Sequence, residues 1–256
     1  MKRTIAGVAL AATLAVAAAT TRPFWVAPDA AQAQSWLRDA ADRRDAGAEA
    51  SLARWSARGD VAARHAYATL LSHRTDAASR QRLEQVLADG ADAGDAADAT
   101  RLAELLARAD ALASRAGADA RERASREDAR VARLLAQGST AHVPAAARLL
   151  ALRALDPSRG TPDPARAAAL MTQAADGGDV PAMFLLANML RAGQGVPRDD
   201  AKALALYQAA GDADYAPAIQ ALAIAWRYGE LGLQADSSQS RLMDHEAAEA
   251  LAHASH

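Results

Sequence analysis

Apolar residues recur along most of the chain at the three- and four-residue spacing of a helix. The clearest examples are two segments, 167–175 and 203–210, in which apolar residues fall on one face of a helix with a period near 3.6 residues. These residues are Ala167, Leu170, Met171, Ala174 and Ala175 in the first segment, and Ala203, Leu206, Tyr207, Ala209 and Ala210 in the second. Each pattern predicts an amphipathic helix packed on one side.

The helix starts recur at a nearly constant interval, which indicates an internal repeat. Val143-Pro144-Ala145, Val180-Pro181-Ala182 and Ala216-Pro217-Ala218 open helical segments 37 and then 36 residues apart, and residues 59–63 resemble residues 178–182. Proline suits the first turn of a helix because its missing N–H has no partner there. Stretches rich in Gly, Pro and Asp at 156–162, 193–199 and 229–236 then separate each first helix from a second one. Each unit is predicted to be a helical hairpin.

Composition supports an all-α fold, since Val and Ile together number only 12 of 256 residues, whereas Ala and Leu are abundant. Residues 76–137 are less regular than the repeats. They predict longer helices over 77–89, 98–115 and 119–137, with Asp98 as an N-cap, and the sequence assigns them no role.

The first 33 residues have the pattern of a secretory signal peptide. Lys2 and Arg3 precede an apolar run from Ile5 to Ala19, and Ala31-Gln32-Ala33 is a small-x-small cleavage sequence. We expect three parts: a signal peptide (1–33), an N-terminal helical region with one weak repeat (34–137) and a repeat region (138–256). The mature protein is expected in the periplasm, without stable membrane insertion; an uncleaved signal would instead anchor it to the inner membrane.

Charge and cysteine content exclude several classes of function. The formal net charge is −2, so no global basic field exists to attract nucleic acid, and there is no cysteine for a disulfide, a thiolate metal site or a nucleophile. We therefore expect no nucleic-acid partner.

Few side chains are spaced for catalysis or metal binding. His245, Glu249 and His253 could share one helix face, but the two histidines would be about 12 Å apart along the axis, too far for one zinc ion. Asp89, Asp92, Asp95 and Asp98 lack the alternation and closing Glu of an EF-hand loop, and no Gly-x-Ser-x-Gly turn exposes a serine. We predict no catalytic residue, no metal and no cofactor.

The repeat at 182–210 resembles the Sel1-like repeat, a relative of the tetratricopeptide repeat. Gly-x-Gly-Val-Pro-Arg-Asp at 193–199, followed by Lys202-Ala203 and an aromatic residue, is its most specific part. Residues 143–178 resemble it with Arg153 where an aromatic is usual, and 215–256 resemble a diverged copy. The residues that define the repeat are Ala182, Leu186, Gly193, Gly195, Asp199, Ala203 and Tyr207.

The resemblance implies a right-handed α-solenoid of antiparallel helix hairpins with a concave face. It also implies an adaptor, regulator, scaffold or immunity protein that binds a protein or peptide on this concave face; the alternative is an envelope hydrolase or cell-wall-acting enzyme. By analogy with such solenoids, the variable first-helix positions are candidate partner contacts. They are Arg64, Thr69, Asn188, Arg191, Ile224 and Arg227.

Overall fold

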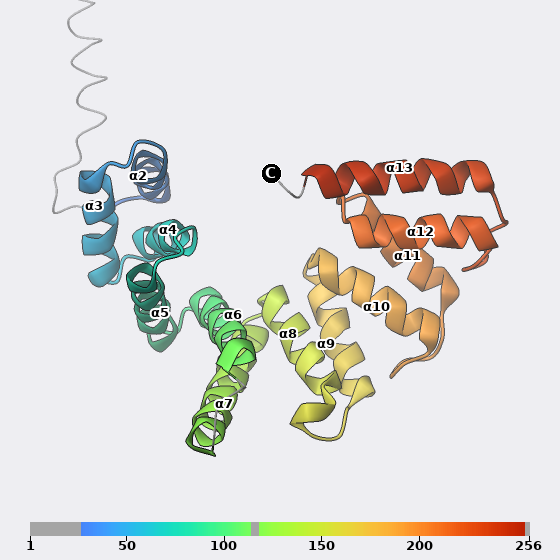
Figure 1. The fold of residues 1–256 in the computed structure, drawn as a ribbon, viewed down its shortest axis with the longest axis horizontal. Coiled ribbons are helices and arrows are strands. Elements are labelled where there is room, and N and C mark those ends of the chain that lie inside the picture. The colour runs from blue at the N-terminus through green and yellow to red at the C-terminus, as the bar shows by residue number, and fades with distance from the viewer. Residues whose placement is uncertain (1–26, 114–117, 254–256) are drawn as a thin grey trace, which may run out of the picture. The chain divides into compact units, whose positions relative to one another are not determined.

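The computed structural model describes residues 27–113 and 118–253, with the side chains of 108–125 and 127 excepted. These residues form twelve α-helices and one 3-10 turn, and no strand occurs among them (Figure 1). The predicted all-α fold class, an α-solenoid of helix pairs, is confirmed. The elements are α2 (Ala30–Asp42), α3 (Ala46–Ala57), α4 (Val61–Ser72), α5 (Ala77–Asp92), α6 (Ala96–Ala113), α7 (Ala118–Thr140), α8 (Pro144–Leu155), η1 (Pro157–Arg159), α9 (Pro164–Asp176), α10 (Val180–Ala192), α11 (Asp200–Gly211), α12 (Ala216–Tyr228) and α13 (Ser237–His253).

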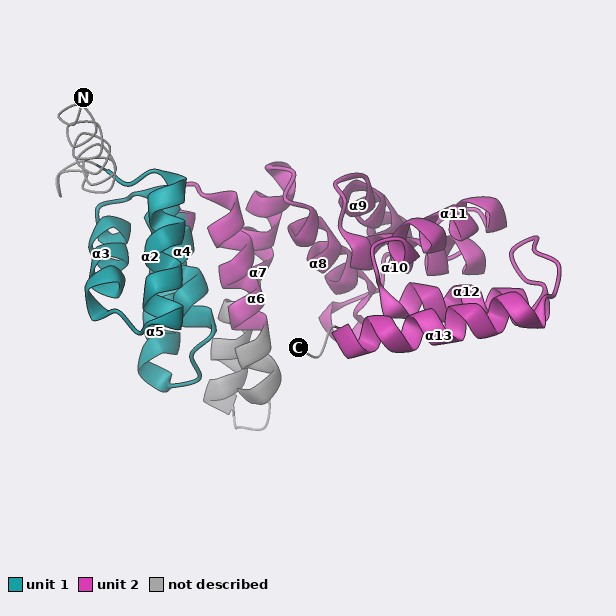
Figure 2. Ribbon diagram, turned by 90° about the horizontal axis from the view of Figure 1, so that it is seen from above, with its two compact units in different colours: residues 1–90 teal, residues 91–256 magenta. Residues whose placement is uncertain are grey.

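The chain divides into two compact units, residues 1–90 and 91–256 (Figure 2). In the first unit, α2, α3 and α4 pack on one another around Leu52, Trp55 and Tyr67. In the second unit, every helix from α6 to α13 packs against the next one in sequence. The division falls within α5 and not at residue 138, where the sequence becomes regular, because α7 packs against α8 of the first clear repeat.

The predicted signal peptide lies largely outside the described residues, which begin at residue 27. Its last residues are helical: Asp29 caps α2 by accepting a hydrogen bond from the Gln32 N–H at 2.8 Å, and Ala33 is buried. Cleavage after Ala33 would therefore remove the first turn of α2. Export and cleavage stay predictions.

One type of joint precedes six helices in the described part of the chain. In each joint, a residue with positive φ is followed by the N-cap residue, and the helix starts at the next position. The positive-φ residues are Arg44, Gly59, Gly94, His142, Gly178 and Asp214. The helices that follow start at residues 46, 61, 96, 144, 180 and 216, and the last four intervals are 35, 48, 36 and 36 residues. Residues 96–140 thus start like a repeat but contain longer helices, which is why the period is not visible there.

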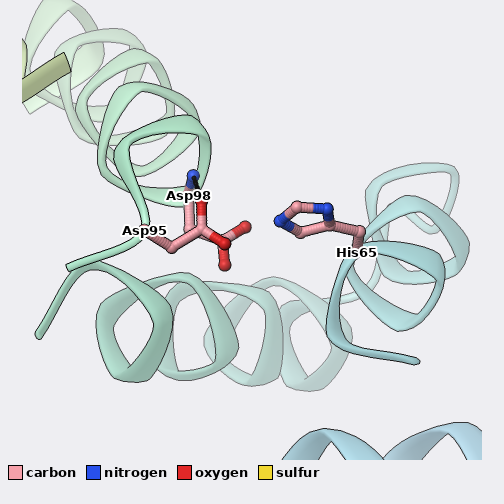
Figure 3. A group of neighbouring side chains, drawn as sticks. All are labelled: His65, Asp95 and Asp98. Atoms are coloured by element: carbon pink, nitrogen blue, oxygen red, sulfur yellow. Dashed lines mark hydrogen bonds between the residues drawn. The ribbon is translucent and has the colours of Figure 1, made fainter. Parts of the chain in front are cut away.

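The start of α6 differs by one turn from the sequence prediction. Asp95, and not Asp98, is the N-cap, because its carboxylate accepts hydrogen bonds from the backbone N–H groups of Ala97 and Asp98 at 3.0 and 3.2 Å. Figure 3 shows Asp95 and Asp98 together at this helix end, and Asp98 is fully buried in the first turn. The prediction failed because either aspartate satisfies the sequence preference for a cap.

Asp179 joins the start of α10 to α8 and should be the most sensitive N-cap of the second unit. Its carboxylate accepts from the Ala182 N–H at 2.8 Å and from Arg148 Nε at 2.9 and 3.0 Å, with the Asp179 side chain only 8% exposed. Asp179→Ala is expected to lower the free energy of unfolding by about 2 kcal/mol, since cap and ion pair are lost together.

The matched variant is Asp163→Ala, which removes an exposed cap of α9 with one hydrogen bond to Arg166 N–H. It should cost about 1 kcal/mol in the same urea titration. Equal losses in the two variants would show that the Arg148 pair contributes nothing.

The first unit contains an ion pair whose contribution depends on pH. Arg74 donates two hydrogen bonds to the Glu49 carboxylate, at 2.8 and 2.7 Å, and these hold the pKa of Glu49 below its ordinary value. The pair therefore stabilises the fold fully above the unfolded-state pKa of about 4.3, and this contribution is lost as pH falls through the lower folded-state pKa.

Glu49→Gln should accordingly lower the free energy of unfolding at pH 7, by up to about 1 kcal/mol for such a solvent-screened pair. The difference from the native sequence should shrink as the pH is lowered below 4. Urea titrations of both proteins at several pH values check this, and a difference that does not change with pH would contradict it.

Candidate partner-binding surface

The joint between α10 and α11 places the residues that define the repeat. Gly193 ends α10 in the left-handed conformation, and Gly195 follows with a positive φ of 73°. Asp199 then starts α11 by accepting from the Lys202 N–H at 2.9 Å. The remaining repeat-defining residues, Ala182, Leu186, Ala203 and Tyr207, are buried in the core of the second unit.

Three of the candidate contact residues have partners within the protein. Asn188 accepts a hydrogen bond of 2.7 Å from the Tyr207 hydroxyl of α11. Arg191 pairs with Glu230, which follows α12, at 3.2 Å. Arg227 pairs with Asp244 of α13 at 2.6 Å. Both arginines remain nearly half exposed, so a partner could still reach them.

The two candidates in the first unit offer less surface. Arg64 is only 3% exposed, and Thr69 is half-buried and donates its hydroxyl to the His65 carbonyl within α4. Helical spacing alone could not reveal this, because α4 lies among α2 and α3 and is covered on more than one side.

Ile224 is the one apolar candidate, and the structure gives it a neighbour that the sequence prediction missed. Ile224 is 43% exposed, and Tyr228, four residues further along α12, is 67% exposed. Residues four apart lie on the same face of a helix. Among the large apolar residues exposed in the described parts of the chain, no other two have this spacing. The i, i+4 relation was visible in the sequence, but exposure was not.

A charged hollow of about 580 Å³ lies at the end of these first helices. Its charged groups are Arg191, Arg198, Asp200 and Glu230. The Arg198 guanidinium donates two hydrogen bonds to Asp200, which lowers the pKa of that carboxyl and keeps it anionic near neutral pH. The hollow therefore presents both signs of charge, which suits a polar protein surface better than a purely anionic ligand.

The residues considered for zinc lie along α13. His245 Nδ1 is 3.7 Å from the Glu249 carboxylate, and both side chains are largely exposed, while His253 is the last residue of the helix. No helix in the described parts of the chain has both the length and the apolar character needed to cross a bilayer.

Comparison with known families identifies the repeat. The Sel1 repeat model matches residues 23–45, 144–179 and 180–215. The chain contains Sel1-like repeats. The last two matches cover the units α8–α9 and α10–α11, and the first covers α2, where the sequence analysis found no repeat. Sel1 repeats are protein-interaction modules, so a general protein-binding role is supported, and Sel1 repeat proteins are generally non-enzymatic scaffolds.

Two solved structures resemble this Sel1-like repeat protein. A protective antigen present in uropathogenic Escherichia coli strains, displaying an SLR fold, aligns over 86% of this chain and 42% of its own, with 20% identity and a TM-score of 0.52. This chain thus spans less than half of that protein, and the likeness shows the fold alone. A Sel1 repeat protein from Oxalobacter formigenes aligns over 46% of this chain and 88% of its own, with 25% identity and a TM-score of 0.43. No curated protein matches the sequence.

Proposed function

We propose that this Sel1-like repeat protein is a periplasmic adaptor whose second unit binds a partner protein through α12. The exposed pair of Ile224 and Tyr228 on a first helix carries the proposal. The basic and apolar N-terminal sequence supports the periplasmic location. Regulator, scaffold and immunity roles all use such a surface, and they differ in the identity of the partner.

The proposal agrees with the usual energetics of protein interfaces. Tyrosine is enriched among residues that contribute most to binding, because its ring buries a large apolar area and its hydroxyl can remain hydrogen-bonded. Completing the burial of Ile224 and Tyr228 would contribute on the order of 1–2 kcal/mol each. The paired Arg191 and Arg227 would supply polar contacts around them.

Affinity capture from periplasmic extract of the source cells tests the proposal. The wild-type chain should retain a specific protein, and Ile224→Asp combined with Tyr228→Asp should lose at least nine-tenths of it. The matched control combines Leu242→Asp with Leu251→Asp on α13, where the native leucines are 50% and 52% exposed. This control should retain the partner. Equal retention by both double variants would contradict the proposed surface, and no retained protein together with turnover of cell-wall material would favour the hydrolase alternative.

A further inference from the structure

A second hollow of about 600 Å³ lies between α9 and α11, over the α10–α11 joint. None of its lining residues belongs to the Ile224–Tyr228 pair or to its arginines. The apolar part of the lining comes from Leu186, Leu190, Val196, Pro197 and Leu206. Leu186 and Leu190 are almost fully buried and form the floor, so the hollow is a groove in the side of the core.

The next repeat shows what size of side chain this position accommodates. The Asp199 N–H donates to the Leu190 carbonyl at 3.1 Å, and the Asp236 N–H donates to the Trp226 carbonyl at 2.7 Å. Leu190 and Trp226 therefore occupy equivalent positions before the second helix of their repeats. Trp226 is half-buried in its repeat, whereas the smaller Leu190 leaves a groove. A volume of this order holds an aromatic side chain and some of its neighbours.

The rim of the groove on the α11 side presents mainly positive charge to solvent. The side chains of Lys202 and Arg198 are 75% and 66% exposed, whereas those of their carboxylate partners, Asp199 and Asp200, are only 35% and 33% exposed. The Lys202 ammonium is 3.6 Å from Asp199, and this carboxylate is already used as the cap of α11. An acidic group approaching this rim would meet the cations first.

We infer that this groove binds an aromatic side chain of a protein partner, with an acidic residue beside it facing Lys202 and Arg198. The inference rests on the proposed protein-binding function and adds an anchoring point separate from α12. The apolar floor takes the ring, and the cations on the α11 side of the rim attract the acidic residue, whereas the exposed Asp176 on the α9 side repels it. The affinity from one such anchor is modest. The groove therefore serves to orient a partner that is already bound at α12.

Selection of random peptides displayed on phage tests the groove without the natural partner. The full chain is immobilised and the bound peptides are collected. Leu190→Trp places in the groove the type of side chain that Trp226 has in the next repeat, so it should block the groove. Peptides that bind this variant as well as they bind the native chain are removed. Enriched peptides should share an aromatic residue with an acidic neighbour.

Lys202→Glu should lower the affinity for the best of these peptides about fivefold, which is the effect of roughly 1 kcal/mol from one charge on the rim. Ile224→Asp with Tyr228→Asp should leave its affinity unchanged, which separates failure of the groove from failure of the α12 surface.

A second blocking variant keeps the test decisive if Leu190→Trp disturbs the fold. Ala205→Glu introduces a carboxylate at an exposed position of α11 that lines the groove, and it should lower peptide affinity at least tenfold with an unchanged melting temperature. The inference would be overturned if no peptide bound the native chain better than it bound the two blocked variants, or if the enriched peptides were basic. It would also be overturned if the native chain formed a concentration-dependent dimer and either variant were a monomer, because the groove would then hold a second copy of the chain.

Discussion

Replacing Gly195 with alanine is expected to lower the free energy of unfolding by about 2–5 kcal/mol. Two costs combine at this position. With φ of 73°, an L-residue loses roughly 1–2 kcal/mol in the left-handed region. The added Cβ would also overlap the carbonyl of Pro164 and lie 2.8 Å from the Ala165 nitrogen, and such overpacking costs about 1–3 kcal/mol. Gly195→Val should be at least as damaging. Urea denaturation followed by circular dichroism measures both losses.

Gly193→Ala is the matched control for this prediction. Gly193 has nearly the same φ, 67°, but a Cβ there would find its nearest neighbour at 3.7 Å, in Arg198. Only the conformational cost remains, about 1–2 kcal/mol. The difference between the two variants therefore measures the packing of the α10–α11 joint on the start of α9. A loss at Gly195 no larger than the loss at Gly193 would show that this contact is not made in solution.

Tyr207→Ala is expected to destabilise the second unit by about 3–5 kcal/mol, the usual range for a large aromatic side chain deleted from a core. Tyr207 is 1% exposed, and its ring lies against Phe184 with 5.8 Å between the ring centres. Tyr207→Phe keeps the ring and removes only the hydrogen bond to Asn188, so it should cost about 1 kcal/mol.

Thermal unfolding of these variants should be compared with that of Tyr228→Ala. Tyr228 is 67% exposed, and its removal should change the free energy of unfolding by less than about 0.5 kcal/mol. The expected order of loss is therefore Tyr207→Ala, Tyr207→Phe and Tyr228→Ala. A large loss at Tyr228 would mean that this residue packs within the protein and is not available to a partner.

The repeat units could be predicted because several joints use residues with few alternatives. Glycine at positive φ, proline in the first turn and aspartate at the N-cap recur in the sequence at fixed offsets, and the structure places Gly178, Pro181 and Asp179 in these roles. The repeat could not be recognised in residues 76–137 for a geometric reason. The helices α6 and α7 after Asp95 are longer than those of the other repeats, so the joint residues are present but the interval to the next joint is not near 36 residues.

Helical spacing could not predict which side chains are exposed and which pair with another residue. Aligning Val143 with Val180 in the sequence puts Arg153 level with Leu190. However, α8 starts at Pro144 and α10 at Val180, and the Asp163 N–H donates to the Ala154 carbonyl, so Ala154 holds the equivalent place. Arg153 instead pairs with Asp128 of α7 at 2.8 Å. Likewise, Asn188 and Arg227 lie at variable positions and yet have partners on the following helix. Such pairs depend on how neighbouring helices are offset.

Photocrosslinking within the source cells tests the central claim, that a protein partner binds at α12, most directly. A photoreactive phenylalanine analogue replaces Tyr228 in one strain and Leu242, an exposed residue of α13, in another. Illumination should join the chain to one discrete protein at position 228 and not at position 242. Absence of any adduct at position 228, or the same adducts at both positions, would contradict the account.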